Sequence, residues 1–122
     1  MHRKLILASL LVLLASQAEA ANRLSLSQYV AVGSPAGVVA QIAADPPTVA
    51  DTIVDFSGGA TQSALFNSKT NYIRVLCDSQ CSVVIGTSPT ASTTSKIIPA
   101  LLPEYFAVPS GGTYRLSVIA NP

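Results

Sequence analysis

Between residues 73 and 85 every second position on each side of a short polar turn is apolar. The apolar positions on one face of this segment are Ile73, Val75, Cys77, Cys81, Val83 and Ile85. Such alternation is the period of a β-strand with one buried face. The turn Asp78-Ser79-Gln80 suits a three-residue hairpin loop, and closing it there pairs Val75 with Val83. The segment therefore predicts an antiparallel hairpin with one apolar face.

Similar short runs recur along the chain, separated by clusters of Gly, Pro, Ser and Asn. This spacing is typical of a sandwich or barrel. Further strands are expected at 23–30, 37–43, 52–56, 104–108 and 113–120, the last two forming a second hairpin through the turn at 109–112. Residues 63–66 fit either a short strand or one turn of helix. The apolar stretch 96–103 contains two prolines, so it is expected at an edge or as a crossing segment.

These patterns together predict an all-β fold. Two hairpins and three earlier strands, each with one apolar face, bury those faces best against one another. We therefore expect a small two-layer antiparallel β-sandwich, jelly-roll-like, that follows an N-terminal signal-like hydrophobic segment.

The first twenty residues differ in character from the rest. A positive start at residues 2–4 precedes the apolar run 5–15 and the small-x-small sequence Ala18-Glu19-Ala20. This order predicts a secretory signal peptide that is cleaved before Ala21. The alternatives are an uncleaved anchor and an unused upstream start codon. Removing 20 of the 122 residues leaves 102 for residues 21–122, a length expected of one domain.

The composition of residues 21–122 excludes several classes of function. The only histidine of the chain is His2, so this part lacks the side chain most often used for acid–base catalysis near neutral pH. We predict that the protein is not an enzyme and has no catalytic residues. Without Arg3, Lys4 and Glu19, the 7 basic and 6 acidic residues each fall to five, giving zero net charge.

A neutral chain without clustered basic residues predicts no binding to nucleic acid, and no membrane association once the signal is removed. Only 11% of the whole sequence is charged. A surface with so few charges either consists largely of Ser and Thr side chains or is partly buried in an assembly. A homo-oligomer is one such assembly.

Cys77 and Cys81 form the only cysteine pair. Their CxxxC spacing differs from the CxxC of thioredoxin-like redox proteins. A structural zinc site needs four ligands, which residues 21–122 do not offer, so no metal and no cofactor is predicted. A cross-strand disulfide is geometrically allowed, and closing so short a loop stabilises by about 2 kcal/mol. Two reduced, buried thiols are the alternative, and the redox compartment decides between them.

Other candidate sites are weaker. Asp51 and Asp55 would lie roughly 13 Å apart on one strand, too far for a glycosidase pair. No GxSxG sequence marks a hydrolase. The tyrosines Tyr29, Tyr72 and Tyr105 form either a sugar-stacking platform or an ordinary strand surface.

The stretch 97–103 is the candidate contact region for other subunits. Its large apolar residues are Ile97, Ile98, Leu101 and Leu102. An exposed apolar edge is a liability for a monomer and useful in an assembly. The alternative is that these four side chains close one end of the core.

From Ser63 to Asn121 the sequence resembles small virion-associated proteins of tailed bacteriophages and prophages. The elements that carry the resemblance are Phe66-Asn67, Tyr72-Ile73-Arg74-Val75, Ile85-Gly86-Thr87, Pro89-Thr90-Ala91, Glu104-Tyr105-Phe106-Ala107-Val108 and a closing Gly-rich hairpin. The resemblance implies a non-enzymatic structural protein, a head decoration or a minor head or tail component, that packs on other virion subunits.

The signal-like segment departs from this family, because phage heads assemble in the cytoplasm. It supports an alternative function, an exported β-sandwich binding module of the periplasm or cell surface.

Overall fold

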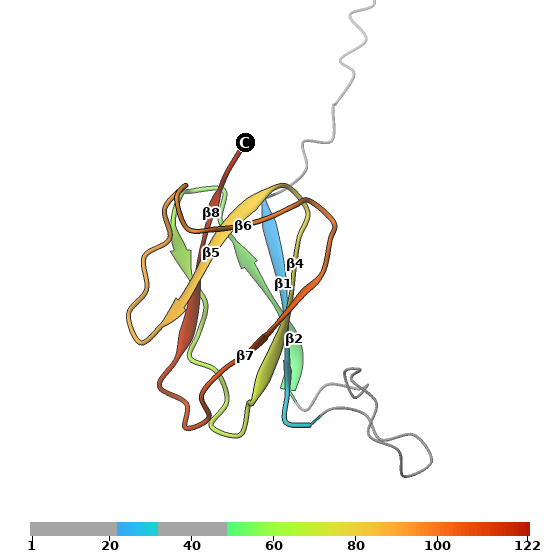
Figure 1. Ribbon diagram of the computed structural model, residues 1–122, viewed down its shortest axis with the longest axis vertical. Helices are drawn as coiled ribbons and strands as arrows, with labels where there is room; N and C mark the ends of the chain where they lie inside the picture. The colour runs from blue at the N-terminus through green and yellow to red at the C-terminus, as the bar shows by residue number, and fades with distance from the viewer. Residues whose placement is uncertain (1–21, 32–48) are drawn as a thin grey trace, which may run out of the picture.

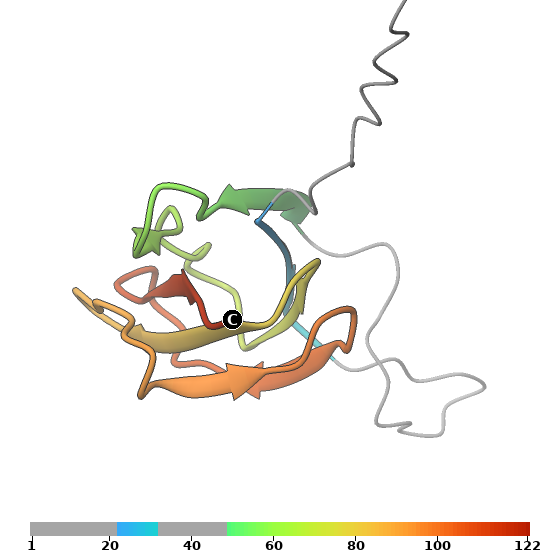
Figure 2. The same cartoon turned by 90° about the horizontal axis from the view of Figure 1, so that it is seen from above.

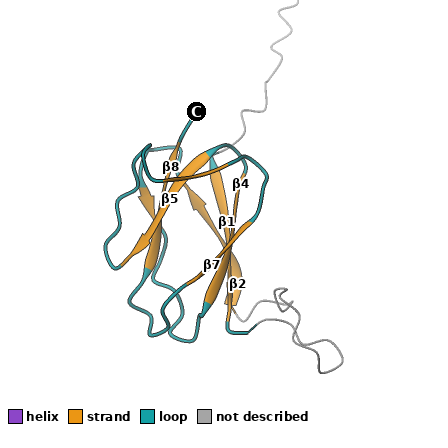
Figure 3. Cartoon of the chain, in the orientation of Figure 1, coloured by secondary structure: helices purple, strands orange, loops and turns teal. Residues whose placement is uncertain are grey.

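The computed structural model describes residues 22–31 and 49–122, and in these ranges it contains strands and no helix (Figure 3). The strands are β1 (Arg23–Tyr29), β2 (Val49–Asp55), β3 (Thr61–Gln62), β4 (Tyr72–Cys77), β5 (Cys81–Gly86), β6 (Lys96–Ile98), β7 (Glu104–Ala107) and β8 (Arg115–Ala120). The predicted all-β fold is confirmed. Residues 63–66 adopt neither of the two structures expected for them. The expected strand 37–43 and the signal-like segment lie outside the described residues.

The strands form two antiparallel sheets that face each other, which confirms the predicted sandwich (Figure 1). One sheet has the order β2-β1-β4-β7 and the other the order β3-β8-β5-β6. We call them the β1 sheet and the β8 sheet, after a central strand of each.

This order is that of a jelly roll with one strand moved along the chain. A jelly roll has eight strands in two sheets. If its strands are lettered B to I along the chain, one sheet has the order B-I-D-G and the other the order C-H-E-F. When β2 to β8 are lettered B to H and β1 is lettered I, the two sheets of this protein have the same two orders. The first strand of this chain therefore occupies the position of the last strand of the standard fold.

The two ends of the described domain meet at the turn between β4 and β5, as the permuted order requires. Arg23 N–H donates to Asp78 Oδ1 over 2.9 Å, and Asp78 N–H donates to the Arg23 carbonyl over 3.0 Å. On the other side, Gln80 Nε2 donates to the Asn121 carbonyl over 2.8 Å. Figure 1 shows the C-terminus and the start of β1 at the same end of the sandwich. The turn thus holds the first and last strands at one end of the sandwich.

Both predicted hairpins are wrong, and in the same way. β4 pairs with β1 and β7, whereas β5 pairs with β8 and β6, so the turn at 78–80 crosses from one sheet to the other. The segment between β7 and β8 crosses in the same manner. The alternation of apolar and polar residues determines which face of a strand is buried, but it does not determine which other strand pairs with it. Val75 and Val83 are therefore both in the core, on opposing sheets rather than on one ladder.

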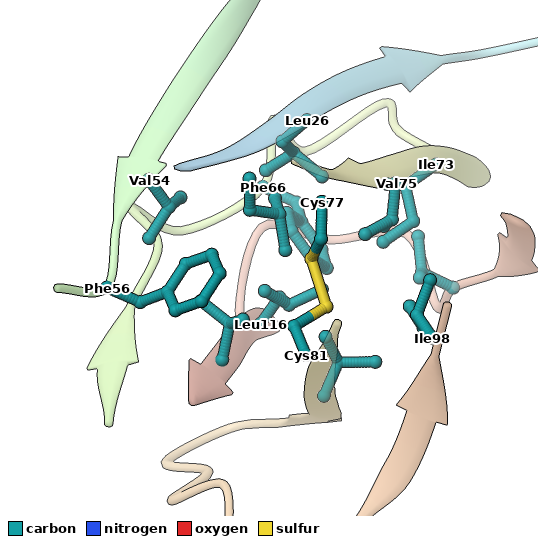
Figure 4. Packing of buried hydrophobic residues seen from close by; sticks show 14 residues of the cluster. Leu26, Val54, Phe56, Phe66, Ile73, Val75, Cys77, Cys81, Ile98 and Leu116 are labelled. Carbon is teal, nitrogen blue, oxygen red and sulfur yellow. A yellow bond between two sulfur atoms is a disulfide. The ribbon is translucent and has the colours of Figure 1, made fainter. Parts of the chain in front are cut away.

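The core lies between the two sheets (Figure 4). It is formed by the inward side chains of the strands, with Phe56 and Phe66 from the connections. The fully buried large side chains include Leu24, Leu26, Phe56, Ile73, Val75, Ile98, Leu116 and Val118. Every second residue of β4 is buried, as the sequence pattern predicts.

Candidate functional site

The sandwich has two opposite edges where the sheets end, and they differ in chemistry. β6 and β7 end the two sheets on one side, and β2 and β3 end them on the other. Viewed from above, the orange strands β6 and β7 lie along one side and the green strands β2 and β3 along the opposite side (Figure 2). We call them the β6–β7 edge and the β2–β3 edge.

Four of the six exposed large apolar side chains of the described residues lie at the β6–β7 edge. They are Ile97 (50% exposed), Leu101 (69%), Leu102 (52%) and Tyr105 (54%), which we call the apolar segment. The other two are Ile53 (60%) on β2 and Leu65 (46%). Leu101 has a φ of 60°, in the left-handed region that side chains other than glycine rarely adopt. Its N–H donates to the Cys77 carbonyl over 2.8 Å, which fastens this turn to the end of β4.

Ile98 does not belong to the contact surface predicted for it. It is 0% exposed and packs in the core, because it pairs with the inward-facing Cys81. Its neighbour Ile97 pairs with Ser82 and points to the opposite face of β6. The two predicted roles of this stretch are thus divided: Ile98 closes the core, while Ile97, Leu101 and Leu102 are exposed.

Two inward-facing charges bridge the sheets at the β6–β7 edge. Lys96 pairs with Val83 and Glu104 with Val75, and both of these valines face the core. Lys96 Nζ lies 3.3 Å from Glu104 Oε2 and 5.0 Å from the centre of the Phe106 ring. The adjoining groove, of about 300 Å³, is lined mainly by the apolar residues beside Lys96. Inward charges of this kind discourage another strand from adding to the edge.

The β2–β3 edge contains a cleft of about 350 Å³ instead. It opens where β3, only two residues long, faces the seven-residue β2. Its lining residues are Leu26, Gln28, Thr52, Ile53, Val54, Asp55, Thr61, Gln62, Ser63 and Ala64. The buried Leu26 and Val54 supply an apolar floor, and the polar side chains stand around it.

Gln28 is the unusual residue of this cleft, since it is a polar side chain only 6% exposed. Its Oε1 accepts hydrogen bonds from the Asn67 N–H and from Thr70 Oγ1, each 2.8 Å long. A backbone N–H can only donate, so these contacts identify the oxygen of the amide. The Nε2 group of Gln28 donates no hydrogen bond to any described residue. Among the described residues, no acceptor faces this oriented amide donor.

Asp51 and Asp55 are both exposed on β2. The Asp55 carboxylate accepts hydrogen bonds from the Ser57 hydroxyl (2.7 Å) and the Ser57 N–H (3.0 Å). These bonds, aided by the charge of Arg23, hold the pKa of Asp55 below its ordinary value. The carboxylate thus stays ionised at the mouth of the cleft.

Cys77 and Cys81 are bonded to each other, with the sulfur atoms 2.09 Å apart. The bond closes the crossing turn and joins the two sheets through the core, because β4 and β5 belong to different sheets (Figure 4). Both residues are 0% exposed.

The three tyrosines do not form an open platform. Tyr29 is only 6% exposed, and its ring stacks on Tyr72 with 4.9 Å between the ring centres. Tyr105 is exposed on the edge strand β7, where it pairs with Arg74 rather than with another tyrosine. The burial of Tyr29 and its stacking on Tyr72 leave no open sugar-stacking face at this pair.

A loop covers the outer face of the β8 sheet. Ala91 N–H donates to Ser117 Oγ over 2.9 Å, and Gln62 Nε2 donates to the Pro89 carbonyl over 2.7 Å. Ser82 and Ser117 on that face are consequently buried. Pro89 and Ala91 therefore lie over this sheet face.

Among the described residues, no group of three or more His, Cys, Asp or Glu side chains is placed to hold a metal ion. No helix in the described ranges is long and apolar enough to cross a membrane. Comparison of the chain with protein-family models, curated proteins and solved structures yields no match. The resemblance to phage virion proteins therefore stays a prediction.

Proposed function

We propose that this protein is a non-enzymatic structural protein that packs against other protein subunits through the apolar segment. Leu101 is the observation that carries the proposal. Its side chain is 69% exposed and its φ is 60°, a conformation that costs an ordinary residue roughly 1–2 kcal/mol. A strained turn that presents a leucine to solvent has no benefit for the isolated domain, but it suits a contact that buries the leucine.

The assembly we propose is the virion of a tailed bacteriophage or prophage, with this protein as a head decoration or a minor head or tail component. The resemblance of residues 63–121 supports this assignment. The edge itself favours contact through side chains rather than strand addition. Pro103 and Pro109 flank β7, and Lys96 and Glu104 point inward, which are features that discourage strand pairing.

The test removes the apolar side chains without harming the fold. A Leu101→Asp, Leu102→Asp variant is suitable, because aspartate tolerates the left-handed conformation better than leucine does. After prophage induction, the unaltered protein is expected in washed particles by mass spectrometry, and the variant is expected to be absent from them. Leu65→Asp is the matched control, since Leu65 is 46% exposed and lies outside the apolar segment. A variant that remains in particles, or an unaltered protein that is missing from them, contradicts the proposal.

The second candidate is an exported β-sandwich binding module of the periplasm or cell surface. The disulfide between Cys77 and Cys81 favours it, because disulfides persist mainly in oxidising compartments. Recovery of the protein in a periplasmic extract, with an N-terminus at Ala21, would support export. Retention of Met1 in a soluble product would contradict the signal peptide.

A further inference from the structure

We propose that the β2–β3 cleft binds an extended, neutral or basic peptide segment of a partner protein. The segment adds as a strand along β2 and places one apolar side chain on the floor of the cleft. This site lies on the edge opposite the apolar segment, so it does not depend on the function proposed above.

The free edge of β2 is the first argument. Within the described ranges β2 pairs only with β1, so no described strand occupies the other side of its backbone. The two-residue β3 leaves most of this edge without a facing strand. β2 also lacks the protection of the opposite edge, because its sequence VADTIVD has no proline and its inward positions Thr52 and Val54 are uncharged. Such edges bind extended peptides through main-chain hydrogen bonds.

Gln28 is the second argument. Two hydrogen bonds to its Oε1 fix the side chain, so the Nε2 group is oriented before any ligand arrives. The Nε2 atom is not fully enclosed, so a carbonyl group that enters the cleft can reach it. The carbonyl groups of a peptide are acceptors that an adding strand brings to the cleft, so a peptide provides the partner that the described residues lack.

The shape and charge of the cleft define the segment further. A volume of about 350 Å³ above Leu26 and Val54 has room for a side chain of the size of valine or leucine. Asp55 is the single charged residue of the lining, and Asp51 is exposed on the same strand. An acidic segment would be repelled there, and a neutral or basic one would not.

The experiment titrates a peptide into the isotope-labelled full-length protein and follows the spectrum by nuclear magnetic resonance. The probe is a heptapeptide of alternating threonine and valine with a lysine at each end. The Gln28 side-chain NH₂ signals and the backbone amides of 52–55 are expected to shift, with a dissociation constant of about 1 mM or lower. Amide exchange along β2 should slow as well. Absence of saturable shifts at these positions would overturn the proposal.

Two controls separate strand addition from other binding. Ala64→Phe fills the exposed rim of the cleft and should weaken binding at least about tenfold, whereas Ala100→Phe, an equal change at an exposed position of the opposite edge, should leave it unchanged. A peptide with methyl groups on all its backbone amide nitrogens should not bind, because strand pairing along either edge of the peptide needs those N–H groups. Equal binding of the methylated peptide, or equal effects of the two variants, would contradict this site.

Discussion

At the β6–β7 edge the inward side chains nearest solvent are Lys96 and Glu104, and they form an ion pair between the sheets. At the β2–β3 edge the corresponding inward positions hold Thr52, Val54 and Thr61, none of which is charged. Both edges end sheets of four strands, so topology alone does not distinguish them. The side chains do: one edge has an inward ion pair and carries the apolar segment, while the described inward residues of the other are uncharged and lie beside the buried Gln28. A sandwich of this size can thus present two contacts of different kinds.

The largest effect is expected from two adjacent residues of the β6–β7 edge. Ile98→Asp places an unpaired charge in the core and should cost at least about 4 kcal/mol of unfolding free energy, enough to unfold much of the protein. Ile97→Asp changes a half-exposed side chain and should cost less than about 0.5 kcal/mol. Urea denaturation measures both. Similar losses for the two variants would mean that the orientation of β6 is wrong.

The strands could be predicted from the sequence because the buried face of a strand produces an alternating pattern in a short stretch of residues. The period of two placed Ile73, Val75 and Cys77 on the buried face, and the structure buries all three. The pairing of strands could not be predicted in the same way. A three-residue turn closes a hairpin or crosses between sheets, and both arrangements bury the same side chains. Which sheet receives β5 depends on β8 and β6, far along the chain, and no local pattern contains that information.

The two surfaces were predictable to different extents. Proline and leucine content pointed to the stretch 97–103, although only the strand register separates Ile97 from Ile98. The β2–β3 cleft was not predicted. A signal for it exists in β1, where the face formed by Leu24 and Leu26 continues to Gln28, a polar residue at an inward position. The two donors that bind the oxygen of that amide come from Asn67 and Thr70, which the sequence does not connect to β1.

The next largest effect should come from Gln28 itself. Gln28→Leu removes the acceptor for the Asn67 N–H and for the hydroxyl of Thr70, which is 1% exposed. Two unsatisfied donors should cost about 3 kcal/mol of unfolding free energy. Thr70→Val removes only one donor and should cost about 1 kcal/mol, and the double variant should lose less than the sum. Strict additivity in denaturation experiments would contradict the shared hydrogen bonds.

Removing the disulfide should lower the unfolding free energy by a smaller amount and should increase local opening mainly near the apolar segment. Replacing Cys77 and Cys81 by alanine together should lower the unfolding free energy by about 2 kcal/mol in the chain-entropy model. Because Leu101 N–H bonds to the Cys77 carbonyl, amide exchange should quicken in 99–102 more than in 61–64. Hydrogen-exchange mass spectrometry makes this comparison, and equal acceleration at both edges would argue against a local role.

Removing the ion pair of the β6–β7 edge should change association more than stability. Lys96 is 57% exposed and Glu104 29%, so Glu104→Gln should cost no more than about 0.5 kcal/mol of unfolding free energy. It also removes an inward charge that protects the edge, so self-association in sedimentation experiments should increase. Asp51→Asn, on the opposite edge, is the control and should not increase it through that mechanism. An unchanged sedimentation profile for Glu104→Gln would show that the ion pair gives no such protection.

The smallest effect concerns the ionised carboxylate at the mouth of the cleft. Hydrogen bonds from Ser57 lower the pKa of Asp55 in the folded protein, so its stabilising contribution is present above the ordinary value of 3.8 and is lost as the pH falls through the lower folded value. Ser57→Ala removes the hydroxyl that is the largest single cause of this effect and should raise the pKa of Asp55 toward 3.8, while Ser57→Thr should keep it low. A titration of the Asp55 carboxyl carbon by nuclear magnetic resonance, between about pH 2 and pH 6, brackets the ordinary aspartate range. An unchanged titration in Ser57→Ala would mean that the N–H of residue 57 and Arg23 hold the charge without the hydroxyl. In that case the carboxylate would remain ionised at the cleft by means independent of the Ser57 side chain, and the difference in charge between the two edges would persist at lower pH.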